Sequence, residues 1–165
     1  MKKRNNYNNG FTLIELIIYM GIFSMVLLIM VQLFGSVMDV LTESQAKSSV
    51  TQDEEFINLR LDYDLKRASS VVSPSNLGDS SQSLQISVNG ETYVYSLSNG
   101  KLVLSNNSGV YSLNGFDTTV TNLNFKKVGF ANGKNSIVVT YTLTSNTLYR
   151  GRAETKNFRT ISSLR

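Results

Sequence analysis

The sequence predicts an α+β protein in which one long N-terminal helix packs on an antiparallel β-sheet. Three observations predict this class. Apolar residues are concentrated near the N-terminus, where 17 of the 21 residues from Phe11 to Val31 are apolar. No proline interrupts the helical pattern before Pro74. Beyond Pro74, apolar residues alternate with polar ones and Asn-Gly pairs separate the alternating runs, a pattern typical of β-hairpins.

We divide the chain into four segments. These are a leader (1–10), the membrane-spanning half of the helix (11–38), its amphipathic half (39–73) and a β-sheet head (74–165). The apolar run from Phe11 to Met38 has 28 residues. At about 1.5 Å per residue it measures roughly 42 Å, more than the ~30 Å hydrocarbon core of a bilayer. The basic leader favours a cytoplasmic position for the N-terminus.

The amphipathic half carries one apolar stripe at helical spacing, which predicts a helix face that packs on the head. We expect the helix to run from about Thr12 to Ser70. Asp62 faces Lys66 one turn away better than it faces Asp64, so these acids are interpreted as ion-pair partners rather than as an acid–base pair. The stripe consists of Val50, Ile57, Leu61, Leu65, Ala68 and Val72.

In the head, period-two alternation predicts a β-meander that covers one side of the helix. Asn-Gly pairs at Asn89-Gly90 and Asn99-Gly100 predict tight hairpin turns, because both central residues of a type I′ turn need positive φ. Two further Asn-Gly pairs, Asn114-Gly115 and Asn132-Gly133, also separate predicted strands. The expected strands are 83–88, 93–97, 101–105, 109–113, 120–128, 136–144, 148–152 and 156–164.

Composition excludes several kinds of site. The chain has no Cys and no His, so disulfides, thiol catalysis and Cys/His zinc sites are excluded. The acids of the head are scattered, and no glycine-rich phosphate loop precedes a helix. We therefore expect no enzyme activity, no cofactor and no metal. Calcium is left open, although no loop has the dense oxygen-ligand spacing of an EF-hand. These acids are Asp79, Glu91, Asp117 and Glu154.

The residues around Gly10 form a specific arrangement: a basic leader, then Gly10, the aromatic Phe11, and Glu15 at a fixed offset. This arrangement resembles the class III signal of type IV prepilins and pseudopilins. The resemblance implies that prepilin peptidase cleaves between Gly10 and Phe11 and methylates the new amino group of Phe11. It also implies that Glu15 pairs with the Phe11 amine of a neighbouring subunit and thereby sets the register of assembly.

Two further features narrow the resemblance. The mid-helix proline of many major pilins is missing, and Gln32 stands near its place. The run Leu59–Ala68 is similar to J-type minor pseudopilins, and the closing segment 158–165 to the last strand of minor pilin-like proteins. We therefore expect a pilin-like fold and a minor structural subunit of a type IV filament, whether a pilus, a type II secretion pseudopilus or a competence pilus.

The resemblance also implies partners and a location. The expected partners are other pilin or pseudopilin subunits, prepilin peptidase, an inner-membrane assembly platform and membrane lipid. The chain would cross the cytoplasmic membrane once with its head outside the cytoplasm, and then enter a filament on the cell surface or in the periplasm. The alternative function is a single-pass membrane-tethered β-domain that acts as an adhesion or DNA-binding module.

Charge leaves three interpretations of the surface open. Without the leader the chain has 13 basic and 12 acidic residues, so its overall charge does not indicate a nucleic-acid partner. Residues 39–67 hold seven acids and four bases, whereas residues 68–165 hold four acids and nine bases. In the first interpretation, both regions are ordinary solvated surfaces. In the second, the basic head of one subunit contacts the acidic helix segment of a neighbouring subunit. In the third, a basic face of the head binds a partner or DNA. The last interpretation rests on Lys126, Lys127, Lys134, Arg150 and Arg152.

Overall fold

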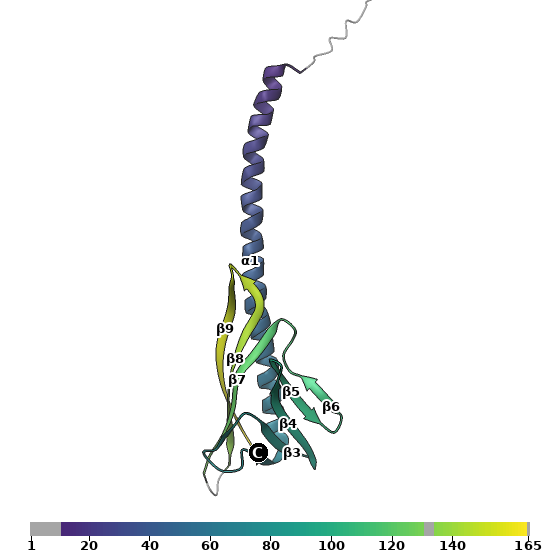
Figure 1. The fold of residues 1–165 in the computed structure, drawn as a ribbon, viewed down its shortest axis with the longest axis vertical. Helices are drawn as coiled ribbons and strands as arrows, with labels where there is room; N and C mark the ends of the chain where they lie inside the picture. Colours follow the sequence, from purple (N-terminus) through teal and green to yellow (C-terminus); the bar gives the residue numbers. More distant parts are fainter. Residues whose placement is uncertain (1–10, 131–133, 165) are drawn as a thin grey trace, which may run out of the picture. The chain divides into compact units, whose positions relative to one another are not determined.

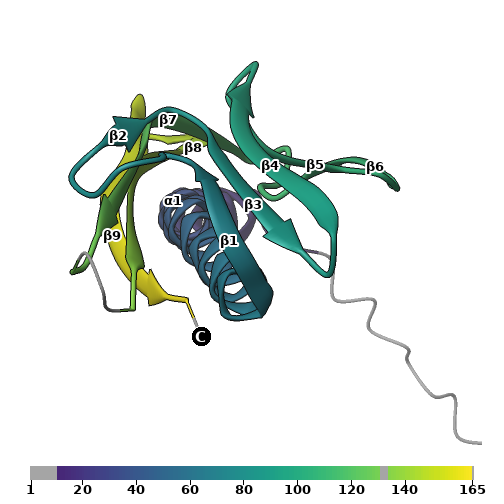
Figure 2. The same cartoon turned by 90° about the horizontal axis from the view of Figure 1, so that it is seen from below.

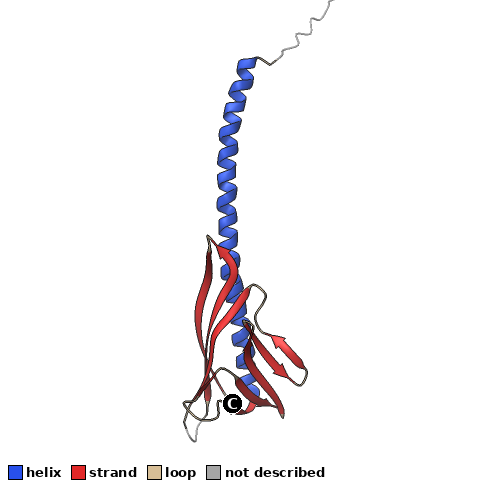
Figure 3. Ribbon diagram, in the orientation of Figure 1, coloured by secondary structure: helices blue, strands red, loops and turns tan. Residues whose placement is uncertain are grey.

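The structure, a computed structural model, describes residues 11–130 and 134–164. Within these ranges one helix precedes nine strands (Figures 1 and 3), an order that confirms the predicted α+β, pilin-like layout. The elements are α1 (Leu13–Arg67), β1 (Ala68–Ser73), β2 (Ser80–Ser81), β3 (Leu84–Val88), β4 (Glu91–Ser98), β5 (Lys101–Asn106), β6 (Gly109–Ser112), β7 (Thr118–Val128), β8 (Ser136–Tyr149) and β9 (Arg152–Ser163).

Contacts within the chain define two compact units, one up to Val40 and the other from Leu41 onward. The described part of the first unit is helical from Leu13 to its end. The second unit, called the head unit below, contains the rest of α1 and all the described strands. The helix is therefore continuous along the chain, but only its second part has a protein core around it.

The helix ends at Arg67, three residues before the predicted end at Ser70. Residues 68–73, which we had placed at the end of the amphipathic segment, form strand β1 and pair with β3. Pairing with β3 decides this change, and the local sequence Ser-Ser-Val-Val allows it, because Ser is a weak helix former and β-branched Val favours strands. Ala68 is buried as predicted, whereas Val72 is 51% exposed and does not belong to the stripe.

The strands form two antiparallel sheets rather than the single meander that the sequence predicted. One sheet has the order β1-β3-β4-β5-β6 and the other the order β2-β7-β8-β9. Figure 2 shows the two sheets on different sides of α1. Period-two patterns predict strands but do not say which strands share a sheet, so this division could not be read from the alternation.

Two Asn-Gly turns are confirmed. Asn89 and Gly90 have φ values of 54° and 84°, and Asn99 and Gly100 have 49° and 74°. These positive values match type I′ hairpin turns, which join β3 to β4 and β4 to β5. The Asn132-Gly133 pair lies outside the described residues.

The last hairpin differs from the prediction. Residues 148–152, expected as a separate strand, span the end of β8, a tight turn and the start of β9. The turn is made by Arg150 and Gly151, whose φ values are 49° and 75°. Arginine rarely adopts positive φ, so its residue type does not indicate a turn at this position. The expected break before Leu148 is instead a shift in register between Thr144 and Leu148.

The hydrophobic core lies between the helix and both sheets. Each of the fully buried stripe residues Val50, Ile57, Leu61 and Leu65 belongs to one core cluster with the inward-facing strand residues, which confirms the predicted packing face of α1. From the strands, the largest fully buried side chains are Tyr95, Tyr141, Phe125, Leu84, Ile86, Leu102, Leu104, Ile137 and Leu143.

A buried polar network also joins the helix to the first sheet. Asp64 is fully buried; its Oδ2 accepts a hydrogen bond from the Tyr95 hydroxyl and an ion-paired hydrogen bond of 2.8 Å from Arg60 Nε. Burial, and then the hydrogen bond to Asp64, raise the pKa of Tyr95, so this hydroxyl stays a donor at neutral pH. A buried carboxylate is tolerated only when such partners compensate for its desolvation.

We predict that Tyr95→Phe lowers the free energy of unfolding by about 1–3 kcal/mol, because it removes a hydrogen bond and leaves a buried carboxylate with less compensation. The measurement is a urea unfolding curve of the full chain in detergent micelles, followed by circular dichroism. Tyr93→Phe is the matched control, since Tyr93 is only partly buried against the core. Equal unfolding midpoints for the two variants would contradict the proposed role of the network.

Candidate functional site

The first turn of α1 is a capping box, in which an N-cap residue and the residue three positions later bond each other's backbone amides. Thr12 is the N-cap: its carbonyl accepts the Leu16 amide at 3.2 Å, and its Oγ1 accepts the Glu15 amide at 3.4 Å. In return, Glu15 Oε2 accepts the Thr12 amide at 3.5 Å and the Thr12 hydroxyl at 3.4 Å. These bonds define where the helix begins.

Glu15 is therefore already held in one conformation by its own chain. All of its hydrogen bonds from described residues reach a single oxygen, Oε2. None of the described residues donates a hydrogen bond to the second oxygen, Oε1. A carboxylate at the first turn also interacts favourably with the positive end of the helix dipole. Both effects reduce the cost of keeping a charge next to an apolar helix.

The predicted cleavage point lies at the edge of the described residues. Gly10 is outside them, so cleavage between Gly10 and Phe11 stays a prediction. The Phe11 side chain is 76% exposed, and its ring contacts the Tyr19 ring edge-on at a centroid distance of 5.9 Å. The Phe11 ring therefore lies beside the first turns of the helix that Thr12 caps.

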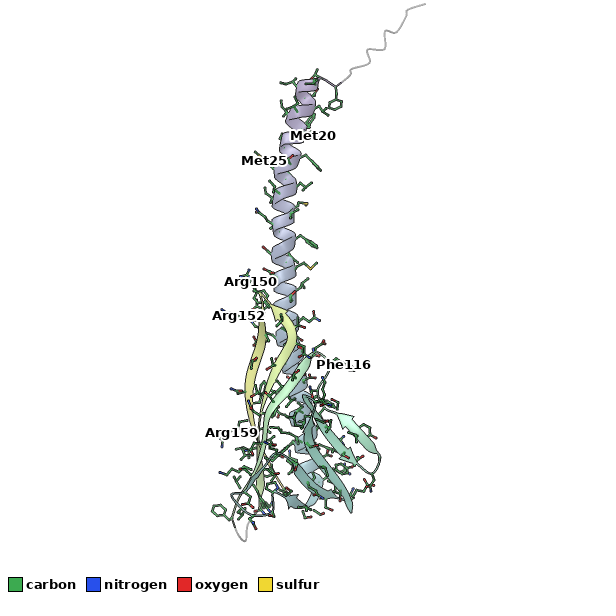
Figure 4. All side chains as sticks on the ribbon, viewed as in Figure 1. Met20, Met25, Phe116, Arg150, Arg152 and Arg159 are labelled. Carbon is green, nitrogen blue, oxygen red and sulfur yellow. The ribbon has the colours of Figure 1, made fainter. Side chains whose placement is uncertain are left out.

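From Leu13 to Met38 the helix presents an apolar surface without a protein covering. All residues of this stretch are exposed except Glu15, which is half-buried. Figure 4 shows the side chains of Met20 and Met25 pointing outward from α1. The helix is long and apolar enough to cross a membrane and lies near the N-terminus. These features fit a membrane-anchored, single-pass protein.

In the head unit, one face of α1 stays uncovered by the sheets. Three apolar side chains on this face are exposed: Phe56 by 53%, Leu59 by 71% and Tyr63 by 54%. Together with Ser163 and Leu164 at the end of β9 they line a groove of about 960 Å³. We call this feature the helix groove. Its other lining residues are Arg60, Asp62, Lys66 and Arg67.

Asp62 fixes one wall of the helix groove. Its Oδ2 accepts a hydrogen bond of 2.7 Å from Lys66 Nζ, and its Oδ1 accepts one of 2.8 Å from the Ser162 hydroxyl. The bond from Lys66, and then the bond from Ser162, lower the pKa of the Asp62 carboxyl. The Asp62 carboxylate therefore forms the ion pair with Lys66 that the sequence predicted. Its second bond, from Ser162, joins the end of β9 to the helix.

The rim of the helix groove carries more positive than negative charge. Lys66 is matched by Asp62, and Arg60 is matched through Nε by Asp64. The Arg67 guanidinium lies over the Tyr63 ring at 4.8 Å, a cation–π contact that uses no carboxylate. The groove therefore combines exposed apolar side chains with a cationic edge, a surface suited to an apolar partner that carries acids.

The five basic residues predicted as one face are not brought together. Lys126 and Lys127 pair with the first residues of β8, and Lys134 precedes that strand. Arg150 and Arg152 lie beyond its other end (Figure 4). β8 has 14 residues, which at about 3.3 Å each separates the two groups by roughly 40 Å. Lys127 also donates a hydrogen bond of 2.8 Å to the Ser75 carbonyl.

The remaining acids of the head show no grouping for chemistry. Among the described residues, no group of three or more acids could hold a metal ion. Asp53 instead acts within the fold: its Oδ2 accepts the Gly115 amide at 2.9 Å and the Thr118 hydroxyl. This places the helix against the loop between β6 and β7.

Comparison with known proteins finds one matching family, the prokaryotic N-terminal methylation motif, over residues 5–31. The chain carries a type IV prepilin-like signal. The signal includes Gly10, Phe11 and Glu15 and ends within the apolar part of α1. It indicates processing by prepilin peptidase and assembly with other pilin-like subunits, which are structural proteins. Comparisons with curated proteins and with solved structures give no match.

Two parts of this site, the capping box and the helix groove, were not predicted from the sequence. The capping box could have been predicted, because Thr12 is followed three residues later by Glu15, directly before an apolar run. Both residues lie within the prepilin-like signal. The helix groove has a weaker sequence pattern: the apolar residues Phe56, Leu59 and Tyr63 recur at helical spacing beside the buried stripe. Periodicity shows that they share a face, but not whether a sheet covers that face.

We predict that Thr12→Ala loosens the start of the helix without shortening the apolar surface. Loss of an N-cap costs about 1 kcal/mol, which corresponds to about fivefold faster hydrogen exchange. The measurement is exchange at the Glu15 amide of the full chain in micelles. Ser24→Ala is the control, because the Ser24 hydroxyl bonds the Met20 carbonyl at 2.7 Å inside the same helix. Unchanged exchange at Glu15 in Thr12→Ala would contradict the capping role.

Proposed function

We propose that the chain is a structural subunit of a type IV filament, processed by prepilin peptidase and assembled through the N-terminal half of α1. One observation carries this proposal: the prepilin-like signal at residues 5–31 leads into a helix whose residues 13–38 present an uncovered apolar surface. Such a surface suits lipid before assembly and other apolar helices after it. The function needs no cofactor and no catalytic residue of its own.

In this function Gly10 and Phe11 flank the cleaved bond, and the new amine of Phe11 is methylated. Glu15 then pairs with the Phe11 amine of a neighbouring subunit. Opposite charges are costly to bury singly and tolerable as a hydrogen-bonded pair, so only one axial register satisfies both. The capping box supports this role, because it fixes Glu15 through Oε2 and leaves Oε1 for the incoming amine.

We further propose a minor rather than a major subunit, with J-type minor pseudopilins as the most similar class. The support comes from the sequence: α1 lacks a proline, and the run Leu59–Ala68 and the closing strand resemble minor subunits. The filament would be a pilus, a secretion pseudopilus or a competence pilus. In each case the head lies outside the cytoplasm and an inner-membrane platform assembles the subunit.

The helix groove gives the head a contact surface in such a filament. We propose that its occupant is the helix of a neighbouring subunit that carries acidic side chains. Apolar side chains of that helix would pack on Leu59 and Tyr63, while its acids would face Arg60 and Arg67 at the rim. The chain's own helix has such an acidic segment, since residues 53–55 of α1 are Asp-Glu-Glu.

The alternative function is a β-domain tethered by one membrane helix. The N-terminus separates the two: a mature chain that begins with N-methylated Phe11 belongs to a filament subunit, whereas a chain that keeps Met1 belongs to a tethered domain. Mass spectrometry of the purified protein gives this answer directly.

We predict that Glu15→Ala abolishes incorporation into filaments while cleavage and membrane residence persist, because the Phe11 amine of the neighbour loses its partner. The measurement is co-purification of the full chain with its partner subunits from membranes, together with the mass of the mature N-terminus. Glu43→Ala is the control, since Glu43 pairs with Lys47 on the surface of the same helix. Normal co-purification of Glu15→Ala would refute the register role.

We also predict that the helix groove becomes inaccessible during assembly. The chain has no cysteine, so Leu59→Cys introduces a single thiol at a 71% exposed site of the groove. Val110→Cys on β6 is the control, with 68% exposure at a position that does not line the groove. A thiol-reactive probe should label both monomers equally, but only the Val110 variant in filaments. Equal labelling of both variants in filaments would exclude the groove as a subunit contact.

A further inference from the structure

We propose that the sheet β2-β7-β8-β9 carries a binding site for an acidic sugar, that is, a hydroxyl-rich ring that bears a carboxylate. The site is a hollow of about 360 Å³ between β7, β8 and β9, called the outer hollow below. It lies within the head unit, and none of its residues takes part in the proposed function. Its polar lining residues are Asn122 from β7, Thr140 and Thr142 from β8, and Asn157 and Arg159 from β9.

The outer hollow is on the face of the sheet that points away from α1. Tyr141 of β8 points inward, since its hydroxyl bonds a side chain of α1 at 3.1 Å. Successive side chains of a strand point to opposite faces, so Thr140 and Thr142 point outward. Thr140 pairs with Arg159 and Thr142 with Asn157 across β8 and β9. Directly paired residues share a face, so these four polar side chains stand together on the outer surface.

A β-bulge in β7 shapes one side of the outer hollow. The register between β7 and β8 shifts between Thr121 and Asn124, so that Asn122 and Leu123 together stand opposite Tyr141. Leu123 is buried in the core, whereas Asn122 is exposed and has a φ of 53°. A bulge of this kind bends the strand and redirects a side chain. It therefore adds an outward-facing amide to the row of polar side chains.

Hydrogen bonds across three strands hold the amides of the outer hollow in place. Asn122 Nδ2 donates to Thr142 Oγ1 at 3.3 Å, and the Thr142 hydroxyl donates to Asn157 Oδ1 at 2.7 Å. Thr142, in the middle, is only 8% exposed. No described residue bonds Asn122 Oδ1 or Asn157 Nδ2, so the row ends in an acceptor on one side and a donor on the other. Two strand spacings separate these ends, roughly 10 Å.

Arg159 supplies a positive charge at the edge of the row. Its side chain is exposed and projects from β9 away from α1 (Figure 4). Among the described residues, no carboxylate forms an ion pair with it. A guanidinium binds a carboxylate through two parallel hydrogen bonds, which fixes the direction of the ligand as well as its charge.

The chemistry of the outer hollow selects a sugar among the anionic ligands. A sugar hydroxyl both donates and accepts hydrogen bonds, which matches a row with an acceptor at one end and a donor at the other. The strand in the middle, β8, pairs with β7 and with β9, so a peptide cannot add to it as a further strand. Nucleic acids need several cations for their phosphates, and this hollow has one.

The experiment measures binding of three probes to the full chain in lipid nanodiscs by saturation-transfer NMR titration. Trigalacturonate has both hydroxyls and carboxylates, its methyl ester keeps the hydroxyls without the charge, and glutarate has carboxylates without hydroxyls. The variants are Arg159→Gln and Asn157→Ala. Arg152→Gln is the matched control, because Arg152 is an exposed arginine of the same strand that does not line the outer hollow.

We expect the unchanged chain to bind trigalacturonate. Arg159→Gln should weaken this binding about tenfold, through loss of a bidentate ion pair, and Asn157→Ala about fivefold, through loss of one hydrogen bond. Arg152→Gln should bind as the unchanged chain does. The methyl ester should bind as weakly as trigalacturonate binds to Arg159→Gln, and glutarate should not bind.

Three results would overturn the proposal: no binding of trigalacturonate, equal binding by the Arg159 and Arg152 variants, or binding of glutarate as tight as that of trigalacturonate. The last result indicates an anion site that does not recognise hydroxyls. The methyl ester removes the charge without any substitution, so this comparison holds even if a variant fails to fold, which circular dichroism detects.

The mature N-terminus separates this proposal from the proposed function. A chain that begins with N-methylated Phe11 and does not bind trigalacturonate is a filament subunit without the sugar site. A chain that keeps Met1 and binds trigalacturonate has the sugar site but is a tethered domain.

Discussion

One continuous helix has to satisfy two surroundings, and the rest of the structure depends on how it does so. Up to Met38 its side chains face outward on all sides, as a lipid-embedded helix requires. Beyond Leu41 one stripe turns inward and becomes the centre of the core. The sequence changes accordingly, from apolar all round to a stripe of Val50, Ile57, Leu61 and Leu65.

Polar contacts fix how the helix and the sheets meet, because apolar packing alone has little directional preference. Asp53 accepts bonds from the loop before β7, Asn58 Oδ1 accepts the Tyr141 hydroxyl at 3.1 Å, and Asp64 accepts the Tyr95 hydroxyl. Asp62 adds the end of β9 through Ser162. These four helix residues touch both sheets, so a shift of the helix by one turn would break all four contacts at once.

The same arrangement leaves two surfaces open. The sheets cover the inner stripe of α1 but not the face with Phe56, Leu59 and Tyr63, which becomes the helix groove. The long hairpin of β8 and β9 extends along the helix, where Tyr149 and Arg152 line a pocket with Glu43 and Ala46.

The sequence by itself determined the features that depend on neighbours along the chain: the prepilin-like signal, the apolar span, the buried stripe, the Asn-Gly turns and the strand content. Only the tertiary structure decided the helix end at Arg67, the division into two sheets and the position of the last turn. Ala68–Ser73 forms a strand because its backbone pairs with β3. The five basic residues lie in two separate groups because β8, which stands between the groups, is 14 residues long. Such outcomes depend on partners distant in the sequence, which local patterns of hydrophobicity and turn residues do not encode.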